Sequence, residues 1–281
     1  LSPSRLQTYT NCERKFFFQR ILRIDEPGSI YLEVGSVFHE VLKELIPVGA
    51  NSGEVRAALR SDATEIIDRA ITKIMPGAGE WLRELTHVHM RLMLDGVHAL
   101  EERRDGEYHV LSVETSASYP SEEDAVLTGR LDRIDDVEGL GPVVVDYKTS
   151  KSLSKTAASI IKEIEEDRDH WQVSVYSALA GALGHPAQGF LYYVVPPGER
   201  EKLNAVGVQL SGGRVRELIR RTGREKPRYD VLPAETLRAV FDDAMTIHAG
   251  VLAGACAYDR TDDPDNCKNC HFIRVCRRNG G

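Results

Sequence analysis

Two aspartates and a lysine lie close together near the middle of this 281-residue chain. Asp132 stands in the segment Gly-Arg-Leu-Asp-Arg-Ile-Asp, and Asp146 and Lys148 stand in Val-Val-Val-Asp-Tyr-Lys. Cleavage of a phosphodiester needs a hard divalent cation with oxygen ligands, which the two carboxylates and the main-chain carbonyl of Tyr147 can supply. The lysine can hold the attacking water or stabilise charge on phosphorus. Taken alone, these groups also fit a structural salt bridge.

Three further side chains have spacings that suit the same chemistry. His39 follows Gly35 in a segment of helical periodicity, and its imidazole can bind the same metal. Gln172 and Tyr176 are four residues apart on an expected helix, so both project from one face. That face can present an amide and a phenol to the catalytic edge or to a phosphate. Each of these residues alone is more often structural, but their combination is specific.

Four cysteines stand at the two ends of the chain. Cys12 lies near the start, and Cys267, Cys270 and Cys276 have the spacing C-x2-C-x5-C near the end. This spacing indicates a metal or cluster site, and four thiolates suit either zinc or an iron–sulfur cluster. If Cys12 joins the other three, one inorganic centre connects both ends of the chain. Cys256 lies outside the pattern and is expected to be an ordinary buried residue.

Composition and charge restrict the class of protein. The chain is 42% hydrophobic and 28% charged, which is ordinary for a soluble globular protein. No stretch approaches the roughly 18 apolar residues of a membrane span and no signal peptide is apparent, so we expect a cytoplasmic protein without membrane contact. The net charge of −7 argues against nonspecific coating of nucleic acid.

Basic residues are nevertheless clustered. Two basic stripes cover residues 5–23 and 214–228. A third group lies among the terminal cysteines: Lys268, Arg274, Arg277 and Arg278. Such stripes either contact phosphates or form solvated helix faces.

The periodicity of apolar residues predicts helices on both sides of a β-rich region. Phe38, Val41, Leu42 and Leu45 fall at helical spacing within residues 35–46. Further helices are expected at 54–75, 80–104, 155–184, 211–222 and 233–253.

Valine-rich segments predict the strands that carry the acidic residues. The expected strands are 109–118, 126–136, 142–148, 189–195 and 204–210. Alternation within the third strand places Val144, Asp146 and Lys148 on one face of the sheet. The opposite face takes Val143, Val145 and Tyr147.

The motifs occur in a recognisable order: Cys12, Gly35-Ser-Val-Phe-His39, Gly129-Arg-Leu-Asp132-Arg-Ile-Asp, Asp146-Tyr-Lys148-Thr, Gln172-Val-Ser-Val-Tyr176 and C-x2-C-x5-C. In this order the chain resembles RecB-type nucleases of the PD-(D/E)XK superfamily over about residues 2–278. It is most similar to the iron–sulfur branch, which includes the AddB nuclease domain and CRISPR-associated RecB-like exonucleases. The resemblance implies a restriction-endonuclease-like α/β fold, with a central mixed sheet flanked by helices. We expect one nuclease domain, 1–281, with a helical insertion at 40–106 and a cluster-binding tail at 259–278.

The resemblance also implies roles for the residues of each motif. His39, Asp132, Asp146 and the carbonyl of Tyr147 would bind Mg²⁺ or Mn²⁺, Lys148 would be catalytic, and the helix with Gln172 and Tyr176 would support the site and DNA. The ligands of a [4Fe–4S] cluster would be Cys12, Cys267, Cys270 and Cys276. Asp146 replaces the glutamate of many relatives. Glu114, on the strand before Asp132, is a further nearby acid on which the prediction does not depend.

We therefore expect a metal-dependent DNA nuclease. It would be an exonuclease of DNA repair or recombination, or the nuclease domain of a helicase–nuclease, acting on single-stranded DNA or duplex ends. Because the chain begins at Leu1, it fits a domain of a larger parent that works with a helicase or recombination complex. The alternatives are an inactive, cluster-stapled DNA-binding scaffold and a zinc-stapled regulatory domain. Intact Asp132, Asp146 and Lys148 favour the nuclease.

Overall fold

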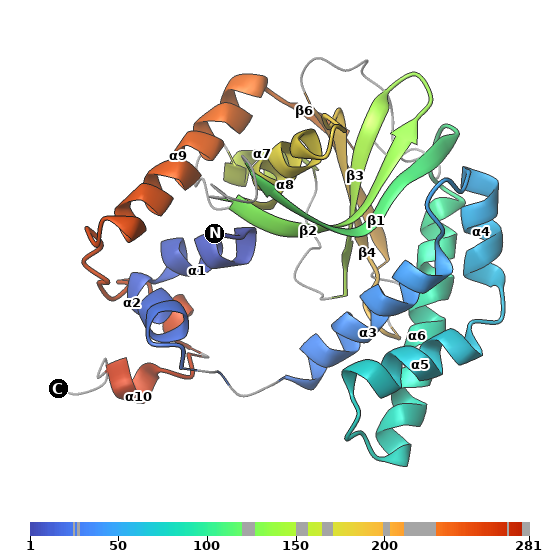
Figure 1. Ribbon diagram of the computed structural model, residues 1–281, viewed down its shortest axis with the longest axis horizontal. Coiled ribbons are helices and arrows are strands. Elements are labelled where there is room, and N and C mark those ends of the chain that lie inside the picture. Colours follow the sequence, from blue (N-terminus) through green and yellow to red (C-terminus); the bar gives the residue numbers. More distant parts are fainter. Residues whose placement is uncertain are drawn as a thin grey trace.

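A six-stranded sheet forms the centre of the computed structural model, which describes residues 1–24, 26, 29–119, 127–149, 157–164, 171–198, 203–210, 229–268 and 270–276 (Figure 1). The strands are β1 (Tyr108–Tyr119), β2 (Leu127–Val137), β3 (Gly141–Lys148), β4 (Gly189–Val194), β5 (Asn204–Leu210) and β6 (Tyr229–Leu232). They lie side by side in chain order. The pairs β3–β4 and β5–β6 are parallel, and the other three are antiparallel. The sheet is therefore mixed, as the sequence predicted.

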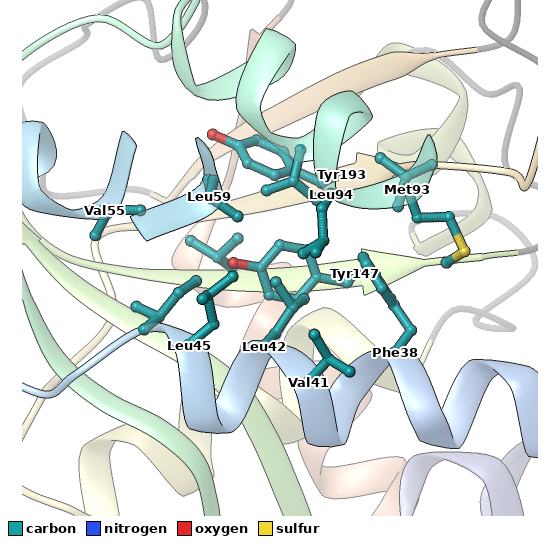
Figure 2. Close-up of a cluster of buried hydrophobic side chains, with 14 of the residues drawn as sticks. Phe38, Val41, Leu42, Leu45, Val55, Leu59, Met93, Leu94, Tyr147 and Tyr193 are labelled. Carbon is teal, nitrogen blue, oxygen red and sulfur yellow. The ribbon is translucent and has the colours of Figure 1, made fainter. Parts of the chain in front are cut away.

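Four consecutive helices form a layer, called here the helical layer, on one face of the sheet. These are α3 (Ile30–Leu45), α4 (Ser52–Arg60), α5 (Thr64–Ile74) and α6 (Glu80–Glu101). Apolar side chains of α3, α4 and α6 pack there against Tyr147 and Tyr193 (Figure 2). The prediction of a single helix at 54–75 is wrong, because the structure has two helices there, α4 and α5. Between them, Asp62 accepts a hydrogen bond from the main-chain N–H of Thr64, the first residue of α5.

The opposite face carries α1 (Pro3–Asn11), α7 (Ala157–Lys162), α8 (Trp171–Ala182) and α9 (Ala234–Leu252). Val144 lies in this second core, whereas Val143 and Val145 lie in the first, so the predicted alternation of β3 is confirmed. Of the helix expected at 155–184, the structure describes α7 and α8, and residues 155–156 and 165–170 lie outside the described residues. The helix expected at 211–222 lies outside the described residues, and the short strand β6 was not predicted.

The two ends of the chain meet at one side of the molecule (Figure 1). The N-terminal elements are α2 (Glu13–Phe16) and a π-helical turn (Phe17–Ile21), and the C-terminal elements are a 3-10 turn (Asp265–Cys267) and α10 (Ile273–Cys276). The rings of Phe18 and Phe272 lie 5.3 Å apart between centroids. Nε of Arg14 donates to the main-chain oxygen of Tyr258 at 3.1 Å. Direct protein contacts therefore join the ends.

None of the helices in the described ranges is long and apolar enough to cross a bilayer.

Candidate active site

All seven residues predicted for catalysis and metal binding line one cavity of about 570 Å³. They are His39, Asp132, Asp146, Tyr147, Lys148, Gln172 and Tyr176. His39 comes from α3 on one side of the sheet, and the last two come from α8 on the other. The adjacent strands β2 and β3 supply the rest, and residues of α1 complete the wall. The helices α1, α3 and α8, which are far apart in sequence, thus meet at the paired strands β2 and β3.

Among the described residues, one group of potential metal ligands consists of His39, Glu114 and Asp132, whose ligand atoms all lie within 4.8 Å of one another. Nδ1 of His39 lies 2.8 Å from Oε1 of Glu114 and 3.5 Å from Oδ1 of Asp132. Both carboxylates are buried. An imidazole and two carboxylates are a ligand set that divalent cations accept.

Glu114, which the sequence analysis named as a nearby acid without relying on it, lies directly in this group. On β1 its neighbours Val113 and Thr115 pair with Arg133 and Leu131 of β2, so Glu114 lies opposite Asp132. Its φ of 45° lies in the left-handed region, which is uncommon for a residue other than glycine. Strained backbone of this kind clusters at functional sites. The only signal in the sequence was a charged residue within a valine-rich strand.

Asp146 is held by two neighbours rather than by the histidine. Its Oδ1 accepts a hydrogen bond from Nε2 of Gln172 at 2.8 Å, and its Oδ2 lies 2.7 Å from Nζ of Lys148. The ion pair that the sequence allowed as a purely structural alternative is therefore present. It lies on the wall of the cavity, however, and the lysine side chain keeps 22% of its surface exposed. Lys148 can therefore reach a molecule bound there.

Close packing of carboxylates changes their protonation. Burial, followed by the charge of Asp146, raises the pKa of Asp132 to about 7. Burial alone would lower the pKa of His39, but the charges of Asp132 and Glu114 raise it above its usual value. The main-chain N–H of Tyr147 donates to Oδ2 of Asp132 at 2.8 Å and partly offsets the first effect. The site thus holds excess negative charge that protons or a cation must neutralise.

The helix α8 is seated directly on β2 at a glycine. A Cβ at Gly129 would lie 2.8 Å from Cδ1 of Leu179 and 3.0 Å from Cε1 of Tyr176. The Tyr176 ring stacks on Phe190. The glycine that opens the Gly-Arg-Leu-Asp motif therefore lets the Leu179 and Tyr176 side chains of α8 pack closely on β2.

A second, smaller cavity contains all four cysteines of the predicted cluster site: Cys12, Cys267, Cys270 and Cys276. Burial raises the pKa of Cys276, and the neighbouring thiols Cys12 and Cys267 raise it further. The prediction for Cys256 is wrong, because this residue is only partly buried and accepts a hydrogen bond from the Tyr9 hydroxyl at 3.2 Å.

The basic stripes are only partly described. Residues 214–228, Arg277 and Arg278 lie outside the described residues. Lys268 forms an ion pair with Asp265. The cavity instead contains Arg130, which the sequence analysis did not single out.

Comparison with known proteins identifies the family. Residues 1–277 match the family model of the PD-(D/E)XK nuclease superfamily. The chain belongs to this superfamily. Membership implies metal-dependent nuclease activity on DNA, and it identifies the mixed sheet with flanking helices as the restriction-endonuclease-like fold.

Comparisons with curated proteins and with solved structures do not extend the superfamily assignment. A search of curated proteins finds no match. Among solved structures, the crystal structure of SSO0001 is similar over 89% of this chain and 97% of that chain, with 14% sequence identity and a TM-score of 0.30. A TM-score this low carries no argument about this PD-(D/E)XK chain.

Proposed function

We propose that this chain is a Mg²⁺- or Mn²⁺-dependent deoxyribonuclease of the RecB-like, cluster-bearing branch of its superfamily. The observation that carries the proposal is the convergence of all seven motif residues on one cavity, with Lys148 beside Asp146. A decayed, inactive relative would be expected to have lost at least one of the acids or the lysine.

The residues of the cavity fit a divalent cation. His39 and Asp132 would bind it, together with Asp146 and the Tyr147 carbonyl, and Glu114 would hold the histidine ring through Nδ1. Burial and, after it, the charge of Asp146 raise the pKa of Asp132, and a bound cation would offset both effects. When bound, the cation would neutralise phosphate charge and acidify a water molecule.

The chain's own residues would act on the substrate around that centre. The Lys148 ammonium would donate to the attacking oxygen or to a phosphate oxygen that gains charge, and Gln172 would hold the Asp146 carboxylate in place. The exposed guanidinium of Arg130 stands at the cavity and would bind a neighbouring phosphate. Tyr176 would border the substrate from α8.

The second cavity would hold a [4Fe–4S] cluster on Cys12, Cys267, Cys270 and Cys276. Support comes from the gathering of all four thiols, including the remote one, around a single cavity. Zinc is the competing occupant, because four thiolates suit both groups. Since hydrolysis transfers no electrons, the role we assign to the cluster is structural.

Exonuclease action on single-stranded DNA or duplex ends, in repair or recombination and beside a helicase, completes the proposal. These points, like the single domain of 1–281 with its insertion at 40–106 and tail at 259–278, are supported by the motif order along the chain.

A cleavage assay on single- and double-stranded DNA with Mn²⁺ or Mg²⁺ tests the proposal. We expect Lys148→Ala to lower kcat by about 10²–10³-fold, because removing one charge-stabilising donor has that effect in other enzymes. Asp146→Ala should be at least as severe. Asp136→Ala, at an exposed position near the end of β2, is the control and should cleave like the wild type. A wild type that cleaves no better than Asp146→Ala would make the inactive DNA-binding scaffold the correct alternative.

A further inference from the structure

A buried network of four charged residues lies between β2 and the helical layer formed by α3–α6. Arg133 of β2 is fully buried, and its Nη2 donates to Oε1 of Glu101 at 2.6 Å and to Oδ2 of Asp135 at 2.8 Å. Arg104 pairs with the same Asp135 carboxylate. Two of these residues, Glu101 and Arg104, come from the end of α6 and the residues after it. The network therefore joins the helical layer to β2.

Burying this network costs desolvation free energy, so the network is not explained by stability alone. Its members are between 0% and 3% exposed, so two positive and two negative charges are removed from water. Buried ion pairs are weak evidence for stability, because well-packed apolar residues of similar volume often serve as well or better. Such groups can instead fix one arrangement of the chain. The question is which arrangement this network fixes.

The network reaches the candidate metal site through one side chain. Nη1 of Arg133 donates to the hydroxyl of Tyr147 at 2.8 Å. The main-chain N–H of Tyr147 binds Asp132, and its ring lies edge-on to His39 with centroids 6.4 Å apart. Tyr147 also stands between Asp146 and Lys148 in the chain. A single tyrosine thus contacts the buried network at one end and the metal-site residues at the other.

We propose that the Tyr147 side chain is a positioning residue for the metal site, held at its hydroxyl by the buried network around Arg133. The inference rests on the proposed function and goes beyond it, since that function uses only the main-chain carbonyl of Tyr147. Anchoring the hydroxyl restricts the ring, and the ring restricts both the His39 imidazole and the main chain that orients Asp132. Preorganised ligands bind a metal more tightly than ligands that must be ordered on binding.

The neighbouring strand supplies a matched control. Tyr193 of β4 is paired in register with Tyr147, is fully buried, and packs against it with ring centroids 5.9 Å apart. Figure 2 shows both rings in the same buried cluster. Within the described part of the chain, the Tyr193 hydroxyl has no hydrogen-bond partner. Tyr147→Phe and Tyr193→Phe therefore make the same chemical change in the same core, close to the same charged groups, but only the first removes a hydrogen bond to the network.

The experiment compares the wild type and both variants in the full chain, with Mn²⁺ alone as the probe in isothermal titration calorimetry. We expect Tyr147→Phe to weaken Mn²⁺ affinity by about 10-fold or more, the lower end of the effect of losing an outer-shell partner of a metal ligand. Tyr193→Phe should bind Mn²⁺ like the wild type. Without metal, Tyr147→Phe should melt at a lower temperature than Tyr193→Phe, because the buried Nη1 of Arg133 loses its acceptor only in the first variant. The Mn²⁺ affinity therefore decides the test.

The outcomes separate this inference from the proposed function. Equal Mn²⁺ affinity in Tyr147→Phe and the wild type would overturn the inference, as would equal weakening in both tyrosine variants. A lower melting temperature of Tyr147→Phe with unchanged Mn²⁺ affinity would show that the contact serves the fold alone. A wild type that binds Mn²⁺ but does not cleave DNA would overturn only the proposed function. A wild type that binds no Mn²⁺ would overturn both.

Discussion

At the scale of single residues, Glu114 has both carboxylate oxygens engaged. Its Oε1 contacts Nδ1 of His39 at 2.8 Å, and its Oε2 meets Nε of Arg130 at 2.7 Å. A carboxylate that holds the ring of a metal-binding histidine fixes its orientation and raises its basicity. Glu114 therefore connects the proposed metal site to the guanidinium proposed to bind phosphate.

Glu114→Gln keeps the shape of the side chain but removes its charge. We expect Mn²⁺ affinity to fall by about 10–100-fold, because outer-shell partners of metal ligands have effects of that size. Calorimetric titration with Mn²⁺ measures the change, and Glu84→Gln on the exposed part of α6 is the control. Unchanged affinity in Glu114→Gln would exclude a role for this carboxylate in the site.

The protonation of the site predicts how pH controls stabilisation by metal. The pKa of Asp132 is about 7 in the folded chain against an ordinary value of 3.8, so the folded state binds this proton more tightly and loses stability as pH rises toward 7. The pKa of His39 is also raised, so its favourable contacts with the acids are lost as pH rises through that folded pKa. Both effects make the metal-free protein less stable above neutral pH than at lower pH.

A bound cation replaces these protons, so Mn²⁺ should raise the melting temperature more at about pH 8 than at about pH 6. Below pH 7, displacement of one proton should weaken the apparent affinity by about tenfold per pH unit. Thermal unfolding with and without Mn²⁺ at the two pH values measures the effect. Asp132→Asn should remove most of the stabilisation by metal. A shift that is equal at both pH values, or larger at pH 6, would contradict the assignment.

The sequence could predict most of these residues but not their contacts. His39, Asp132, Asp146 and Lys148 stand in motifs whose order is informative by itself. The importance of Glu114 depends on the register of β1 against β2, which only the pairing of distant segments determines. The same limit applies to Tyr147, because its hydroxyl contact with Arg133 crosses between two strands.

At the scale of elements, the sequence predicted a helix or strand correctly where the residues of that element alone determine it. The alternation along β3 places side chains on two faces by strand geometry alone, so its prediction was accurate. The break between α4 and α5 arises from a short polar turn at Asp62 inside a continuous apolar pattern. The strand β6 has only four residues and exists through its parallel pairing with β5, which a local pattern does not reveal.

The contact between α8 and β2 gives a test at this scale. Gly129→Ala would place a methyl group 2.8 Å from Cδ1 of Leu179 and 3.0 Å from Cε1 of Tyr176, so these side chains of α8 must move away from the strand. We expect a loss of about 1–3 kcal/mol in the free energy of unfolding, the usual effect of overpacking, together with slower cleavage because Tyr176 lines the cavity. Urea denaturation and the DNA cleavage assay measure the two effects.

Gly181→Ala is the matched control on α8. A Cβ at Gly181 meets no atom within 4 Å, and the residue is exposed in the helix. This change should stabilise the protein by about 0.5–1 kcal/mol, because alanine loses less backbone entropy than glycine in a helix. If Gly129→Ala were as stable and as active as Gly181→Ala, the close seating of α8 would not matter for the site.

At the scale of the whole molecule, the sheet separates two apolar cores, and the active-site cavity contains residues from both sides of it. The chain ends meet on the α1 side of the molecule, where Phe18 packs on Phe272 and Arg14 binds the main chain at Tyr258. These contacts hold the ends together without any inorganic group. The proposed cluster would therefore reinforce an existing connection, and its loss should loosen the ends rather than unfold the chain.

Cys12→Ser tests that connection, because Cys12 is the one N-terminal member of the four-thiol set. We expect the variant to lose its bound iron and sulfide and to become sensitive to proteolysis at both ends, while the sheet stays folded. Each kcal/mol of stability lost should lower the melting temperature by about 2–4 °C. Cys256→Ser, whose thiol contacts Tyr9 outside the set, should keep wild-type metal content. If the wild type contains zinc and no iron or sulfide, the four thiols bind zinc instead of a cluster. If Cys12→Ser keeps the full metal content of the wild type, Cys12 is not a ligand.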